Sequence, residues 1–104
     1  MNQQAMYRKI KKMQDEMIAT QKEIEETVFT ASAGGVVTVE IYGTKEIKSV
    51  VISNDFEAEG PEDYEMLSDM IVAASSEAYK QIDKTTETKM AKYQALLGGM
   101  GGLF

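Results

Sequence analysis

Residues 37–53 read VTVEIYGTKEIKSVVIS, and this stretch decides the fold. Apolar β-branched side chains alternate with other side chains over 37–42, a period of two that is typical of strands. Over 48–53, Lys48, Val50 and Ile52 alternate with Ser49, Val51 and Ser53, and both runs are rich in β-branched residues. Residues 43–46 supply the connection between the two runs, and Gly43 is expected to adopt a positive φ there. The stretch therefore predicts an antiparallel hairpin.

A short strand and a loop are predicted before this hairpin. Val28 and Phe29 lead into a run of small residues that ends at Gly34 and Gly35. The paired glycines are not followed by the Lys and Ser or Thr of a phosphate-binding loop, so we interpret them as a flexible connection. The predicted sheet is a meander of two or three strands.

Residues 2–26 contain no Gly or Pro and predict a long helix. Its apolar side chains recur at steps of 4, 3, 4 and 7, at Met6, Ile10, Met13, Met17 and Ile24. These side chains fall within a stripe about 60° wide, which is typical of a helix that packs against one other helix. We interpret the methionines as packing residues, with an adaptable partner-binding seam as the alternative.

A second long helix is predicted for residues 61–97. Pro61 suits a first helical turn, and acidic residues follow it near the positive end of the helix dipole. Apolar residues then step by threes and fours, at Tyr64, Leu67, Ile71, Ala74, Ala78 and Ile82. Thr85 and Lys89 hold the next positions, so the end of this helix is expected to project from the body. Residues 98–104 are Gly-rich and predict a flexible tail.

The order of helix, strands and helix predicts an α+β fold with a single domain over residues 1–97. A helix of residues 61–97 is about 55 Å long, whereas a compact domain of about 100 residues is roughly 35 Å across. A sheet this small also leaves open edges and apolar surface. A homodimer is the arrangement that we expect to cover them.

The composition excludes several classes of protein. The 104 residues include no His, no Cys and no Trp, so the usual general base and the usual nucleophilic and metal-binding thiols are missing. We therefore predict a protein that is not an enzyme and has no catalytic residue, no cofactor and no small-molecule substrate. No apolar run approaches the ~20 residues of a membrane span, and no signal-peptide pattern is present. A soluble, cytoplasmic protein without a membrane partner is expected.

One acidic segment has the spacing of a metal-binding loop. Asp55, Glu57, Glu59 and Gly60 match the first positions of a calcium-binding EF-hand loop. Met66, however, stands where that loop needs a bidentate Glu. We interpret the segment as a solvated connector that leads into the second helix, and predict no metal site.

The net charge is −6, but the charges are distributed unevenly. Residues 1–12 carry four basic side chains and no acidic one, and residues 80–104 carry four Lys against two acidic residues. Residues 13–79 carry three Lys against 15 acidic residues. The basic residues of the first helix are expected to point away from the apolar stripe, where they are free to meet phosphates. A solvated helix face is the other interpretation of the same pattern.

Several short runs follow one another along the chain: MYRKIKKMQ at 6–14, VTVEIYG at 37–43, VVI at 50–52, EMLSDMIVAA at 65–74, KM at 89–90, and a Gly-rich end that closes on LF at 103–104. In this order and spacing, over residues 5–104, they resemble the YbaB/EbfC family of bacterial nucleoid-associated proteins. The resemblance implies an α–β–β–β–α protomer, with long N- and C-terminal helices flanking a small antiparallel sheet. It also implies a tweezer-like homodimer.

The resemblance further implies binding to duplex DNA with little sequence preference, and a contribution to nucleoid organisation or gene regulation. The DNA contacts of the family are attributed to basic side chains on the helices, which here are Arg8, Lys9, Lys11, Lys12, Lys80, Lys84, Lys89 and Lys92. Tyr42 and Ser49 are neutral where relatives often carry basic residues. Together with the acidic middle of the chain, this predicts weak, salt-sensitive binding.

A protein–protein adaptor without enzymatic activity is the alternative hypothesis. It would use the Met-rich seam of the first helix, or the acidic middle, to hold a helical or basic partner. The negative net charge favours this alternative.

Overall fold

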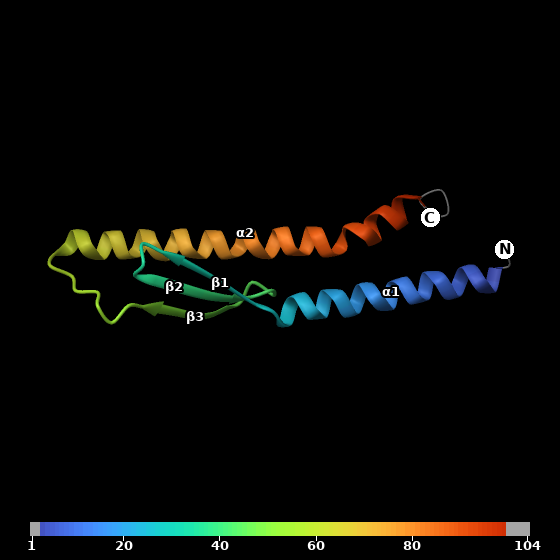
Figure 1. Cartoon of the computed structure of the whole chain (residues 1–104), viewed down its shortest axis with the longest axis horizontal. Coiled ribbons are helices and arrows are strands. Elements are labelled where there is room, and N and C mark those ends of the chain that lie inside the picture. Colours follow the sequence, from blue (N-terminus) through green and yellow to red (C-terminus); the bar gives the residue numbers. More distant parts are fainter. Residues whose placement is uncertain (1–2, 100–104) are drawn as a thin grey trace.

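The computed structural model describes residues 3–99, which form α1 (Gln3–Glu26), β1 (Val28–Ala33), β2 (Val37–Tyr42), β3 (Ile47–Ile52) and α2 (Pro61–Gly99) (Figure 1). The predicted α+β class and the α–β–β–β–α order are confirmed, with three strands in the sheet. α2 continues two residues past its predicted end at Leu97. The rest of the predicted flexible tail, residues 100–104, lies outside the described residues.

The sheet is an antiparallel meander in the order β1-β2-β3. A tight turn joins β1 to β2, in which the Val36 N–H donates to the Ala33 carbonyl over 3.1 Å. Gly34 and Gly35 have φ values of 60° and 67°. Two successive positive φ angles are what a type I′ hairpin turn requires, so these glycines form a defined turn instead of the flexible connection expected from their composition.

The turn between β2 and β3 corrects the role predicted for Gly43. The residue with a positive φ in this turn is Lys45, at 77°, and not Gly43. Gly43 instead lies against the last turn of α1, where its N–H donates to the Thr27 carbonyl over 3.0 Å. A Cβ at position 43 would collide with the carbonyl group of Ile24. Glycine is therefore required by the close approach of two backbones.

α2 packs across one face of β1 and β2. Together they enclose a core of Phe29, Ala31, Val37, Val39, Ile41, Ala74, Ala78 and Ile82. The small side chains of Ala74 and Ala78 allow the helix axis to approach the sheet. Tyr64, predicted to belong to this apolar face, is 61% exposed because the first turns of α2 extend past the end of the sheet (Figure 1).

α1 packs against the second half of α2, as its narrow stripe predicts. Ile24 and Met13 are buried, and Tyr93 of α2 is only 2% exposed. The hydroxyl groups of Tyr93 and Thr20 lie 3.3 Å apart. The end of α2 does project beyond the sheet, but it is covered by α1 along a stripe that the sequence analysis missed. After Ile82 this stripe shifts to Thr86, Met90 and Tyr93.

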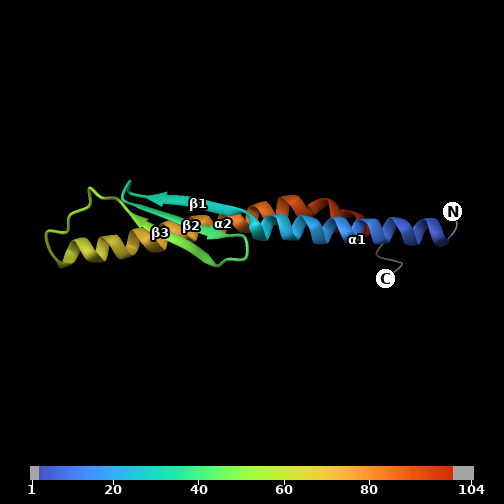
Figure 2. The ribbon, with the colours of Figure 1, turned by 90° about the horizontal axis from the view of Figure 1, so that it is seen from below.

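The result is an elongated rod of 73 × 21 × 16 Å. Its radius of gyration is 20.5 Å, whereas a compact domain of this length has a value of about 13 Å. Because α1 and α2 run antiparallel, the start of α1 and the end of α2 lie at the same end of the rod (Figures 1 and 2). Neither helix, over the residues described, is long and apolar enough to cross a bilayer.

Candidate nucleic-acid interface

The four basic residues near the start of α1 are all exposed: Arg8, Lys9, Lys11 and Lys12. None of them forms an ion pair with another described residue. α1 extends beyond the last turn of α2, so these side chains stand at the tip of the rod (Figure 1). We call the first four turns of α1, residues 3–16, the basic end.

The structure corrects the orientation predicted for these side chains. Lys9 and Lys12 do not point away from the apolar stripe, since they line a groove together with Met6, Ile10 and Met13. Successive residues of a helix are rotated by about 100°, so these four cations lie within an arc of roughly 160° on one side of the axis. The basic end therefore presents its positive charge as one broad face, and Lys9 and Lys12 form the edge of that face beside the groove.

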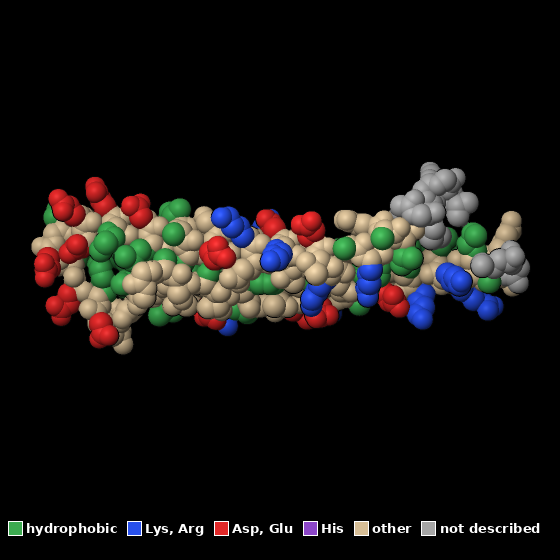
Figure 3. Space-filling view, turned by 45° about the horizontal axis from the view of Figure 1, so that its top comes forward, with side chains coloured by type: hydrophobic (Ala, Val, Ile, Leu, Met, Phe, Trp, Pro, Cys, Tyr) green, Lys and Arg blue, Asp and Glu red, His purple; other side chains and the backbone are tan. Residues whose placement is uncertain are grey.

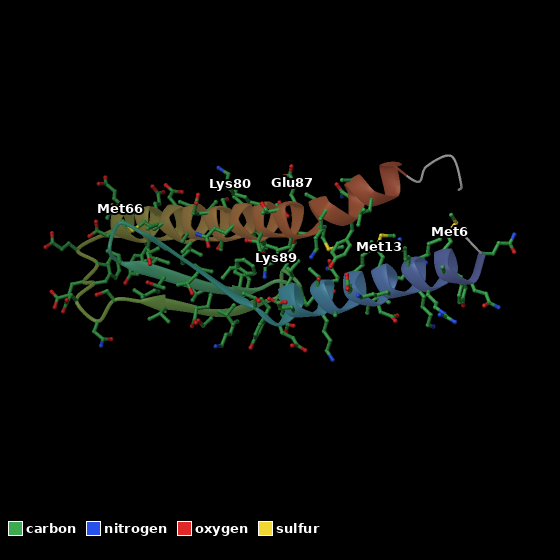
Figure 4. All side chains as sticks on the ribbon, turned by 45° about the vertical axis from the view of Figure 1, so that its right-hand side comes forward. Met6, Met13, Met66, Lys80, Glu87 and Lys89 are labelled. Carbon is green, nitrogen blue, oxygen red and sulfur yellow. The ribbon has the colours of Figure 1, made fainter. Side chains whose placement is uncertain are left out.

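The basic residues of α2 have different surroundings from one another. Lys80 points away from α1, as does Glu87, whereas Lys89 points toward α1 (Figure 4). The Nζ of Lys89 lies 2.9 Å from Oε1 of Glu23. Lys92 lies over the ring of Tyr93, with its Nζ 4.9 Å from the ring centroid. Lys80 and Lys84 are exposed and lie farther back, beside the core residues Ala78 and Ile82.

Charge is segregated along the rod (Figure 3). No basic residue occurs between Lys48 and Lys80, and this interval forms the end of the rod opposite the basic end. We call residues 55–69 of this region the acidic end. Its acidic side chains are Asp55, Glu57, Glu59, Glu62, Asp63, Glu65 and Asp69. A polyanion is therefore attracted to one end of the molecule and repelled by the other.

The acidic end has a structural role in starting α2. Oδ2 of Asp63 accepts a hydrogen bond of 2.7 Å from the Glu59 N–H, and Glu62 and Asp63 lie in the first turn of the helix. Both features stabilise a helix N-terminus. Within residues 3–99 no three His, Cys, Asp or Glu side chains are grouped so that they could hold a metal ion.

The sequence of this chain matches a known protein family. The sequence pattern of the YbaB/EbfC DNA-binding family matches residues 1–98. The chain belongs to this family.

Curated relatives match nearly the whole chain. A nucleoid-associated protein of Agathobacter rectalis is 41% identical over 102 residues, which cover 97% of this chain and 86% of the relative. A nucleoid-associated protein of Clostridium novyi is 44% identical over 107 residues, covering 100% of this chain and 90% of the relative. The resemblance inferred from the short sequence runs is thus confirmed.

A crystal structure of an uncharacterized Helicobacter pylori protein has the same fold. It matches with a TM-score of 0.65 and 21% sequence identity, over 92% of this chain and 98% of the other. The likeness therefore covers both long helices as well as the sheet.

Two features of the candidate interface were missed by sequence reasoning. The first is the seam of Thr86, Met90 and Tyr93, which holds α1 against α2. Steps of 4, 4 and 3 from Ile82 are the signal for it. The second is the groove beside Lys9 and Lys12. Its other wall is Leu96 of α2, which is distant in sequence, so no local pattern predicts the groove.

Proposed function

We propose that this chain is a non-enzymatic protein of the nucleoid that binds duplex DNA as a homodimer through its basic end, with little sequence preference. It would thereby contribute to nucleoid organisation or gene regulation. The observation that carries the proposal is the segregation of charge, because residues 3–14 at this tip include four exposed cations and no acidic residue, and Asp15 and Glu16 are the first acidic residues of α1. Arg8, Lys9, Lys11 and Lys12 are the principal contacts.

Charged side chains, and not the helix dipoles, dominate the electrostatic potential at this tip. The positive end of the α1 dipole and the negative end of the α2 dipole lie at the same end of the rod, so the two dipoles oppose each other. Four exposed cations without ion pairs to described residues remain as the source of attraction for phosphate. Contacts from Lys and Arg to phosphate hold a protein on DNA without reading the bases, which supports low sequence preference.

Lys80, Lys84 and Lys92 are secondary candidates for DNA contact. Lys89 is a weaker one, because its ammonium group is 2.9 Å from the Glu23 carboxylate. Both partners of this pair are largely exposed, so the pair itself adds little stability.

The surface of β3 supports the proposed homodimer. Val50 and Ile52 lie opposite Val39 and Val37 of β2, so they share the face of the sheet that α2 covers. α2 packs across β1 and β2, and Val50 remains 41% exposed. β3 is also an edge strand, with one side of its backbone open to pairing.

α2 contributes apolar surface beside this strand. Tyr79 donates a hydrogen bond of 3.3 Å to the Lys45 carbonyl in the β2–β3 turn, so this side of α2 faces β3. Val72 lies two turns earlier on the same side and is 64% exposed. We call Val50, Ile52 and Val72 the β3 surface, and propose that two copies pack together through it.

The β3 surface can be tested with neighbouring residues of one strand. Val50→Lys places a charge in the proposed interface and should yield a monomer at concentrations where the native chain is a dimer, as measured by native mass spectrometry. Val51→Lys is the matched control, because Val51 lies on the opposite face of the same strand and is already exposed. A Val50→Lys variant that remains dimeric would rule out this interface.

Salt dependence tests the proposed contact with phosphate. If the basic ends of a dimer make between four and eight phosphate contacts, the slope of log Kobs against log salt concentration should be about −4 to −7. Gel shifts of duplex DNA at several salt concentrations measure this slope. Retardation that is unchanged between low and moderate salt would contradict binding by these cations.

The acidic end favours a second candidate function, that of a protein–protein adaptor. Seven exposed or half-buried carboxylates within residues 55–69, without a basic neighbour in sequence, form a surface suited to a basic partner. Recovery of one basic protein in stoichiometric amount, after nuclease treatment, would favour this candidate. Recovery of nucleic acid alone, from the same lysate without nuclease treatment, would favour the first.

A further inference from the structure

A groove at the tip of the rod has no occupant among residues 3–99. Met6, Ile10, Met13 and Leu96 form its apolar walls, and its volume is about 430 Å³. Lys9, Lys12 and Glu16 stand at its rim. We call it the tip groove. Pockets of this size hold ligands or several side chains, and apolar walls of this kind favour apolar occupants.

The tip groove exists because the two helices end at different levels. The hydroxyl groups of Thr20 and Tyr93 lie 3.3 Å apart and mark where α1 and α2 are level. From there α2 continues to Gly99, about 9 Å, whereas the stripe of α1 continues to Met6, about 21 Å. The last roughly 12 Å of the stripe therefore have no helix opposite them.

Apolar surface is accessible at the open end of the groove. Met6 of α1 is 38% exposed and Leu96 of α2 is 52% exposed, whereas Ile10 is half-buried and Met13 is buried deeper in the groove. Met6 and Met13 lie on the side of α1 that is turned toward α2 (Figure 4). The stripe thus continues in the same direction, with the same residue types, after its partner helix has ended.

We propose that residues 100–104 of the same chain occupy the tip groove. They follow directly on Gly99 and read MGGLF, with three large apolar side chains and no charged one. Five extended residues reach up to about 17 Å, which is enough to cover the roughly 12 Å of stripe that remains. Gly101 and Gly102 let the chain turn from the helix axis into the groove.

A tethered segment has an advantage over a separate partner. Because residues 100–104 are joined to α2, their effective concentration at the groove is of the order of millimolar, and no translational freedom is lost on docking. The rim carries two Lys and one Glu, so its net charge is small and an uncharged occupant can bind. Docking would hold the start of α1 against the end of α2 and so define where Lys9 and Lys12 stand.

Disulfide trapping tests this proposal, because the native chain contains no Cys. The test pair is Met6→Cys with Leu103→Cys, and the control pair is Gln4→Cys with Leu103→Cys. Positions 4 and 6 are rotated by about 200° from each other, so Gln4 lies at the same level on the other side of α1. The measurement is the rate of disulfide formation within one chain, followed on non-reducing gels at low protein concentration.

We expect the test pair to oxidise at least about tenfold faster than the control pair. Equal rates would mean that the segment is free, as its Gly-rich composition suggests, and would overturn the proposal. A disulfide between two chains would also overturn it, because the groove would then hold a segment of a second copy. This readout does not depend on DNA, so it can fail or succeed independently of the proposed function.

A second measurement leaves Leu103 intact. Phe104→Trp introduces a single indole into a chain without Trp, and a docked indole should emit at shorter wavelength than a solvated one. Adding Ile10→Gln, in the wall of the groove, should shift the emission to that of a solvated indole. Adding Ile18→Gln should leave it unchanged, because Ile18 lies on α1 outside the groove and is exposed. Identical emission in the two double variants would contradict docking.

Discussion

Replacing Lys9, Lys11 and Lys12 together by Glu should abolish the retardation of duplex DNA. Each of these side chains is exposed at the tip of α1 and forms no ion pair with a described residue, so each is free to meet a phosphate. The substitutions remove three cations and add three anions per protomer. Affinity should fall by roughly 100-fold or more at low salt, with a shallower salt slope in any binding that remains. Gel shift and fluorescence anisotropy measure both quantities.

A charge-matched control separates position from net charge. The control variant replaces Lys22, Lys45 and Lys48 by Glu, which changes the net charge by the same amount. These three residues lie away from the basic end. In about 0.1 M salt the Debye length is about 10 Å, so charges farther than this from the basic end are largely screened and DNA binding should change little. The ion pair of Lys45 is mostly exposed, and that of Lys48 is half-exposed and 3.9 Å long, so both contribute little to folding. Equal loss of binding in both triple variants would exclude the basic end as the contact surface.

Gly43→Ala should destabilise the fold more than its single added methyl group suggests. The new Cβ would collide with the carbonyl group of Ile24, which is backbone and cannot rotate away. The β2–β3 turn and the end of α1 must therefore separate, which also strains the hydrogen bond from the Gly43 N–H to the Thr27 carbonyl. We expect a loss of about 3 kcal/mol in the free energy of unfolding, and a fall in Tm of roughly 10–20 °C. Circular dichroism on heating measures it.

Gly60→Ala is the matched control for this variant. A Cβ at position 60 would meet no atom within 4 Å, and Gly60 has no positive φ. The expected change is neutral or a stabilisation of up to about 1 kcal/mol, since alanine restricts the unfolded chain. Both variants should be compared at one protein concentration, because a dimer couples stability to concentration. A Gly43→Ala variant with the same Tm as the Gly60→Ala variant would refute the close approach of the two backbones.

Local periodicity predicted the elements of this fold well. The alternation over residues 37–42 corresponds to β2, and its apolar members Val37, Val39 and Ile41 are fully buried. The stripe of α1 predicted a helix that packs on one other helix, and α2 is that helix. These predictions succeed because residues two apart on a strand, or three and four apart on a helix, share a face in any fold.

The same local rules did not predict which part of each helix is covered by another element. Tyr64 belongs to the apolar stripe of α2 but lies beyond the sheet, so nothing described covers it. After Ile82 the partner of α2 changes from the sheet to α1, and the buried face of the helix rotates to include Tyr93. Lys9 and Lys12 were expected to point away from the stripe, yet they line a groove whose other wall is Leu96.

By itself, the sequence determined the order and type of the elements, the family, and the division of charge between the first helix and the middle of the chain. The residue pattern left two or three strands open, and the resemblance to the family implied three. Only the tertiary structure decided that α1 extends beyond the end of α2, so that its cations are exposed at the tip of a rod. It also decided that Lys89 is paired with Glu23, and that glycine is needed at position 43. The physical reason is range: periodicity and charge runs are properties of neighbouring residues, whereas pairing, covering and collision depend on segments that are distant in sequence.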